Sequence, residues 1–224
     1  VQKFLVQEGS AIEASRMIEH IVNAQSLEEL HLKVYNNYIL VDIRKKLKKY
    51  SSLIEQMASK QDKAITFEIL GDEVLVEYNK YSEFINSLIH IFRNMIDHGI
   101  ESQGERKNKK KPLQASIKVQ VKKNKDHFLM IFSDDGQGID LEKIKKTATK
   151  SGLKTEKEVD ELPNEEVYNL IFSHGFTTRD SVDDISGRGV GMEAVLTEII
   201  NIGGSISVSS KADKETKFTV KLPL

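Results

Sequence analysis

Polar side chains suited to metal or phosphate chemistry gather in one short stretch, H-I-F-R-N-M-I-D-H-G at residues 90–99. Imidazole, amide and carboxylate groups can hydrogen-bond to phosphate or bind a divalent cation. On a helix that turns about 100° per residue, they cluster within roughly 100° of arc. The converging residues are His90, Asn94, Asp97, His98 and Glu101.

Gly99 follows this cluster and is a candidate C-terminal cap, which would place the polar face at the end of a helix, within reach of a ligand. An ordinary solvated face is the alternative interpretation. Such faces usually carry Lys and Glu, so two His with Asn and Asp favour a site modestly.

A helix beginning near Ser82 would position these residues, because apolar side chains form a stripe on its other side. The stripe consists of Ile85, Leu88, Ile89, Phe92 and Ile96. We expect it to face the core.

Strand and helix patterns alternate downstream of residue 63. Alternating apolar residues at 65–69 and 74–78, separated by Gly71-Asp72, predict a β-hairpin. Further strands are expected at 116–122, 128–133, 205–209 and 217–222, and helices at 141–151, 164–172 and 191–202. The pattern predicts an α+β fold, a mixed and mostly antiparallel sheet with helices on one face.

Residues 1–63 are predicted to form a separate region, an all-α helical hairpin. Helical patterns run over 11–24 and 27–57, and Ser26 with Glu29 resembles a capping box. A seam with steps of 3 and 4 follows, made of Leu40, Ile43, Leu47, Tyr50, Ile54 and Met57. It favours homodimerisation through residues 1–63 slightly over a helical cap packed on its own domain.

Composition excludes several classes of protein. The 224 residues are 39% hydrophobic and 30% charged with net charge −1, which fits one or two globular domains and gives no general attraction to nucleic acid or membrane. The basic run at 106–111 is interpreted as a solvated loop. The absence of cysteine excludes thiolate zinc sites and is compatible with a cytoplasmic location. No membrane span is visible, and Val1 indicates a fragment of a longer protein.

Two glycine-rich segments could bring the backbone close to a ligand. S-D-D-G-Q-G-I-D at 133–140 follows a strand, and S-G-R-G-V-G-M-E at 186–193 precedes a helix whose N-terminus could hold phosphate. Neither is a P-loop or a Rossmann fingerprint. Between them, I-F-S-H-G-F-T-T-R-D at 171–180 is interpreted as a hinged lid.

These four motifs, in this order and spacing, resemble the ATP-binding domain of CheA-type histidine kinases. The wider group is the Bergerat-type ATPase fold shared with gyrase, Hsp90 and MutL. The likeness covers residues 65–224 and implies an ATP-binding domain at 64–224, with ATP and Mg²⁺ as cofactors.

The resemblance assigns roles residue by residue. Asn94 would hold Mg²⁺, Asp134 would accept from the adenine amino group, and His90 and Asn94 would be catalytic. The implied cofactor-binding set is Arg93, Asn94, Asp97, His98, Asp134, Gly136, Gly138, Ile139, Lys143, Phe176, Thr177, Thr178, Ser186, Gly187, Arg188, Gly189, Val190, Gly191, Met192 and Thr216. In the family's last glycine turn this chain has Glu215 at a glycine position, although Thr216 is retained.

The same resemblance favours phosphate transfer over hydrolysis. The gyrase, Hsp90 and MutL branch has a Glu that readies water four residues before the motif Asn, and His90 stands there in this chain. We expect transfer of the ATP γ-phosphate to a histidine on a separate phosphotransfer domain that serves a response regulator. A clamp ATPase, or a degenerate scaffold that works through its helical hairpin, are the alternatives.

Overall fold

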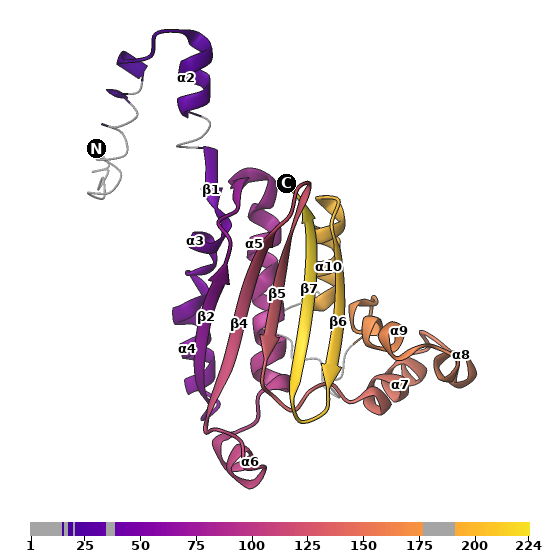
Figure 1. Cartoon of the computed structure of the whole chain (residues 1–224). Helices are drawn as coiled ribbons and strands as arrows, with labels where there is room; N and C mark the ends of the chain where they lie inside the picture. The colour runs from indigo at the N-terminus through magenta and orange to yellow at the C-terminus, as the bar shows by residue number, and fades with distance from the viewer. Residues whose placement is uncertain (1–14, 16–17, 20, 35–38, 177–190) are drawn as a thin grey trace, which may run out of the picture.

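A five-stranded mixed sheet forms the frame of the molecule (Figure 1). This computed structural model describes residues 15, 18–19, 21–34, 39–176 and 191–224. The strand order is β2-β4-β5-β7-β6; β2 runs parallel to β4, and the other neighbours are antiparallel. The strands are β2 (Ala64–Gly71), β4 (Gln114–Lys123), β5 (His127–Asp134), β6 (Ser205–Lys211) and β7 (Glu215–Pro223).

Buried and more exposed side chains alternate along the strands, which gives the sheet one buried face. In β4, β5 and β7 every second side chain is buried, which is the period expected when one face packs on a core. Helices cover that face, with α5 and α10 behind the sheet in Figure 1. The predicted α+β class with a mixed, mostly antiparallel sheet is confirmed.

The central helix α5 (Tyr78–Asn94) continues into a single π-helical turn at Met95–Gly99. It begins four residues before the predicted start. Ile85, Leu88, Phe92 and Ile96 of the predicted stripe are buried, and Ile89 is half-buried. Residues outside the stripe are buried as well, because α5 also contacts α10 and α4. These additional residues are Tyr81, Phe84, Ile91 and Met95.

The structure describes further helical elements in addition to α5 and its π-helical turn, and α2 lies away from the sheet (Figure 1). They are α2 (Leu27–Val34), α3 (Ile43–Leu47), α4 (Tyr50–Ser59), α6 (Gln103–Asn108), α7 (Leu141–Lys150), α8 (Glu156–Asp160), α9 (Asn164–Asn169), a 3₁₀ turn at Leu170–Phe172, and α10 (Met192–Asn201). Within the described residues, no helix is long and apolar enough to cross a membrane.

The single helix predicted over 27–57 is wrong. The strand β1 (Leu40–Asp42) interrupts it and pairs with β3 (Leu75–Glu77), and α3 and α4 follow. Asp42 caps α3 by accepting from the Arg44 backbone N–H at 3.0 Å. The predicted seam residues from Ile43 to Ile54 do share one apolar face, and their side chains are buried in the same core as the sheet.

The predicted hairpin at 65–78 is also wrong. β2 pairs in parallel with β4, so that Ala64 lies opposite Gln114 and Gly71 opposite Val121. Gly71 has φ +100°, and a Cβ there would meet the Val121 carbonyl oxygen at 1.9 Å. The chain therefore leaves the five-stranded sheet at Gly71, and β3 joins β1 instead.

Candidate functional site

Asp134 occupies the last position of β5, and its side chain is buried. Its Oδ1 accepts from the Gly136 backbone N–H at 3.0 Å. Its Oδ2 is buried and has no hydrogen-bond partner among the described residues. A buried carboxylate oxygen without a donor is costly, so this atom is a candidate acceptor for a ligand donor.

Burial raises the pKa of Asp134 to about 7. The negative charges of Asp135 and Glu101 act in the same direction, and the Gly136 N–H opposes them by donating to the carboxylate. The carboxyl is thus poised to change its protonation state near neutral pH, unlike an ordinary surface aspartate.

The turn after Asp134 presses against the end of the π-helical turn. A Cβ on Gly136 would lie 2.1 Å from the Gly99 carbonyl oxygen, and a Cβ on Gly99 would lie 3.3 Å from Asp134 Oδ2. The Gln137 N–H also donates to the Gly99 carbonyl at 2.8 Å. Glycine at 99 and 136 therefore lets the two backbone segments approach each other and the Asp134 carboxylate more closely than a side chain would allow.

The β6–β7 turn closes the other side of this region. Thr216 lies opposite Asp134 in the β5–β7 ladder, is buried, and has a hydroxyl without a partner among the described residues. Gly138, with φ +77°, approaches the Lys211 carbonyl so closely that a Cβ would be 2.7 Å from it. The half-buried Ile139 donates its N–H to Ser210 Oγ at 2.8 Å.

The β6–β7 turn is intact despite Glu215 at the expected glycine position. Glu215 pairs with Lys211, and its carbonyl accepts from Ser210 Oγ at 2.9 Å. Asp213, with φ +55°, adopts the left-handed conformation within the turn.

His90, Arg93 and Asn94 lie on the last turns of α5. Asn94 and His90 are half-buried, and Arg93 is exposed. Burial lowers the pKa of His90, and the Arg93 charge adds to that effect, so the imidazole is neutral at pH 7.

The other members of the predicted polar face have separate surroundings. Asp97 Oδ1 accepts from Gln61 Nε2 at 2.6 Å, which ties it to the segment between α4 and β2. The carbonyl of the exposed His98 accepts from Gln137 Nε2 at 2.8 Å. Glu101 does not join this face, because the helix ends at Gly99 and its carboxylate is buried in ion pairs.

The remaining predicted residues divide between described and undescribed parts of the chain. Lys143 is exposed on α7, and Phe176 is half-buried against the core. Gly191 is the N-cap of α10, and Met192 begins that helix and is buried. Residues outside the described part are Thr177, Thr178, Ser186, Gly187, Arg188, Gly189 and Val190.

The basic run at 106–111 is not a solvated loop, and this prediction is wrong at two positions. Arg106 is only 1% exposed and contacts Glu101 Oε2 at 3.1 Å and Asp135 Oδ2 at 2.8 Å. Lys111 Nζ lies 2.7 Å from Glu101 Oε1. Their acidic partners, Glu101 and Asp135, lie outside the basic run, so the composition of the run does not indicate these ion pairs. Glu101, five residues before Arg106, is the one nearby residue that could have suggested a buried ion pair.

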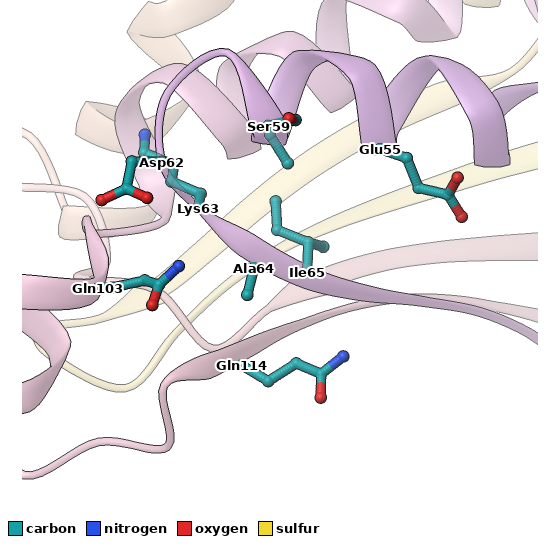
Figure 2. A pocket seen from close by; sticks show the side chains of 9 residues that line it. Glu55, Ser59, Asp62, Lys63, Ala64, Ile65, Gln103 and Gln114 are labelled. Atoms are coloured by element: carbon teal, nitrogen blue, oxygen red, sulfur yellow. The ribbon is translucent and has the colours of Figure 1, made fainter.

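A separate shallow pocket of about 370 Å³ lies between α4, β2, α6 and the start of β4. Figure 2 shows Glu55, Asp62, Ile65, Gln103 and Gln114 around it. None of the predicted nucleotide-binding residues lines this pocket. It is therefore distinct from the region around Asp134.

Comparison with known proteins agrees with this geometry. The family described as "Histidine kinase-, DNA gyrase B-, and HSP90-like ATPase" matches residues 84–224. The chain is 38% identical over 185 residues to the chemotaxis protein CheA of Halobacterium salinarum, and 30% identical over 229 residues to that of Bacillus subtilis. These matches cover 83% and 100% of this chain but 28% and 34% of the relatives.

Solved structures show the same fold. The catalytic domain of histidine kinase ThkA has a TM-score of 0.53 at 17% identity, with coverage of 82% of this chain and 93% of that one. The mycobacterial sensor histidine kinase MprB has a TM-score of 0.51 at 16% identity, covering 82% and 97%.

The chain belongs to the family of histidine kinase-, gyrase B- and Hsp90-like ATPases. Membership in this family implies ATP binding. Within the family it is a CheA-like histidine kinase ATP-binding catalytic domain.

Proposed function

We propose that this chain transfers the γ-phosphate of ATP to a histidine on a separate phosphotransfer domain, which then serves a response regulator. The observation that carries the proposal is the buried Asp134 Oδ2 without a donor among the described residues, beside a backbone that carries no side chain at Gly99 and Gly136. The amino group of adenine is a donor, and a flat base suits a wall of backbone without side chains. The missing donor therefore fits adenine.

Asn94 is the proposed Mg²⁺ ligand, with Arg93 and His98 contributing to the phosphate side. Among the described residues, no group of three or more His, Cys, Asp or Glu could hold a metal on its own. That fits Mg²⁺, which keeps several waters and is usually bound by few protein groups together with substrate phosphates. When bound, Mg²⁺ would supply neutralisation of phosphate charge.

The glycine segment at 186–191 and the start of α10 are proposed to surround the phosphates, with Phe176, Thr177 and Thr178 in the preceding lid. Gly191 and Met192 form the N-terminus of α10, where free N–H groups favour an anion. Lys143 and Asp97 remain proposed contributors, with Asp97 oriented by Gln61.

His90 supports transfer rather than hydrolysis. A side chain that activates water should be a base of suitable pKa within reach of the water, and a carboxylate serves this role in the gyrase branch. At the corresponding position this chain has the half-buried His90 in place of a carboxylate. An acceptor imidazole brings its own lone pair, so positioning and charge neutralisation suffice.

Residues 1–63 are proposed to mediate homodimerisation, and residues 64–224 to form the ATP-binding unit. Apolar side chains on the described N-terminal helices support this proposal, since Ile18, Val22 and Leu27 are 61%, 74% and 83% exposed. The named chemotaxis relatives support a cytoplasmic two-component signalling role.

The decisive experiment mixes the chain with radiolabelled ATP and Mg²⁺, with and without a phosphotransfer domain from a CheA relative. We expect label on the acceptor domain, slow ATP hydrolysis in its absence, and no transfer by an Asn94→Asp variant. Steady hydrolysis without an acceptor would support a clamp ATPase instead. Absence of nucleotide binding would support a degenerate scaffold.

A further inference from the structure

Two basic side chains, Arg106 on α6 and Lys111 just after it, hold the turn that follows Asp134. Lys111 Nζ donates to the carbonyls of two successive residues, Asp135 at 3.1 Å and Gly136 at 2.7 Å. Arg106 also donates to Asp135, to the backbone carbonyl at 3.3 Å and to the side-chain carboxylate at 2.8 Å. Two cations therefore hold one short turn through both its backbone and its side chain.

The Glu101 carboxylate forms ion pairs with both of these cations. The side chain is 1% exposed and lies within 3.1 Å of Arg106 and 2.7 Å of Lys111. A buried charge pair holds its geometry strongly, because removal of one partner leaves the other without compensation. Glu101 lies two residues after Gly99, the last residue of the π-helical turn, so these ion pairs join the end of that turn to the loop after β5.

The turn that Arg106 and Lys111 hold sets the orientation of the Asp134 carboxylate. The Gly136 N–H donates to Oδ1, and this bond leaves Oδ2 as the buried oxygen without a donor among the described residues. If the Asp135 and Gly136 peptides turned over, Oδ1 would lose its donor and the carboxylate could rotate.

We propose that Lys111, supported by Arg106, is a positioning residue of the adenine pocket: it fixes the Asp135–Gly136 turn so that Asp134 keeps one oxygen for the base. This inference rests on the proposed placement of adenine at Asp134. Lys111 touches no nucleotide itself and acts only through the turn.

The test compares Lys111→Met with Lys111→Arg and Lys109→Met in the full 224-residue chain. Arginine retains a cation with several donors, whereas methionine keeps the aliphatic stem alone. Lys109 is the matched control, because it also pairs with Glu101, at 3.5 Å, but no described hydrogen bond joins it to the turn carbonyls.

Two quantities are measured: the dissociation constant for ADP by calorimetry, and amide hydrogen exchange of Gly136 in the nucleotide-free chain. In Lys111→Met we expect about tenfold weaker ADP binding and faster Gly136 exchange. In Lys111→Arg and Lys109→Met both quantities should stay within about twofold of the unmodified chain.

Unchanged ADP binding and exchange in Lys111→Met, or equal losses in Lys109→Met, would overturn the inference while leaving the nucleotide site intact. If Lys111→Met does not fold, Glu101→Gln/Lys111→Met removes the buried negative charge that Lys111 helps to balance, and the same measurements are made on it with the same expectations. No ADP binding by the unmodified chain would overturn the adenine site itself, and the inference with it.

Discussion

Asp134 and Thr216 lie directly opposite each other in the β5–β7 ladder, and each has a buried side-chain oxygen without a hydrogen-bond partner among the described residues. Two such atoms on adjacent strands are unusual, because buried polar groups are nearly always paired. A ligand with polar atoms at this end of the sheet would satisfy both, and adenine is the group we assign there.

Nucleotide affinity should depend on pH through Asp134. Adenine donates to this carboxyl, so binding favours the ionised form, and the pKa of about 7 means that this form disappears as pH falls. We expect ADP binding to be about tenfold weaker at pH 6 than at pH 8.

Calorimetry at several pH values, in buffers of different ionisation enthalpy, measures this dependence together with the proton released on binding. The Asp134→Asn variant is the control, because any pH dependence that it retains belongs to the nucleotide or to other groups. Equal pH dependence in both proteins would show that Asp134 does not titrate in this range.

Stability without nucleotide should show the opposite trend. In the unfolded chain Asp134 loses its proton near the ordinary pKa of 3.8, whereas in the folded chain it does so near 7. Between these values the folded state binds more protons, so the free energy of unfolding decreases as pH rises from about 4 to about 7. Urea denaturation of the unmodified chain and Asp134→Asn at pH 5 and pH 8 checks this. The free energy of unfolding of the variant, relative to that of the unmodified chain, should be higher at pH 8 than at pH 5.

Gly136→Ala should disrupt the turn and weaken nucleotide binding. The added Cβ would lie 2.1 Å from the Gly99 carbonyl oxygen, so one backbone segment must move, at a cost of about 1–3 kcal/mol. Gly104→Ala is the matched control, since nothing lies within 4 Å of its added Cβ and alanine favours the helix α6 by about 0.5–1 kcal/mol. Thermal unfolding and ADP titration should separate the two variants, and equal behaviour would contradict the close approach at Gly136.

The α3–α4 segment should contribute to the stability of the core. Leu47 is fully buried, so Leu47→Ala should lower the free energy of unfolding by about 2–5 kcal/mol. Leu32 on α2 is 60% exposed, and Leu32→Ala should change it by no more than about 0.5 kcal/mol. Denaturant titration at low protein concentration measures both, and a small effect of Leu47→Ala would mean that α3 is only loosely attached.

The sequence predicted the elements whose signals are local. Strands β4, β5, β6 and β7 were found within a few residues, because alternation and flanking turns are properties of short stretches. The proposed site around Asp134 rests on a motif and on its order among other motifs.

Pairing between distant segments explains two of the errors. The partner of β2 is β4 rather than β3, and no local pattern distinguishes a hairpin from a parallel crossover. Arg106 looked solvated because Asp135, which pairs with it, lies 29 residues away. The break at β1 was hidden because the buried seam from Ile43 to Ile54 keeps a helical period on both α3 and α4.

The most direct test of the central claim is calorimetric titration of a non-hydrolysable ATP analogue with Mg²⁺ into the unmodified chain, Asp134→Asn and Asn94→Asp. In Asp134→Asn the amide oxygen would accept from Gly136 and the amide NH₂ would face the adenine donor, so binding should weaken by about tenfold or more. Asn94→Asp should weaken binding through the altered charge beside Mg²⁺ and phosphate. Binding by the unmodified chain with losses in both variants is the predicted result; unchanged affinity in Asp134→Asn would contradict the adenine site.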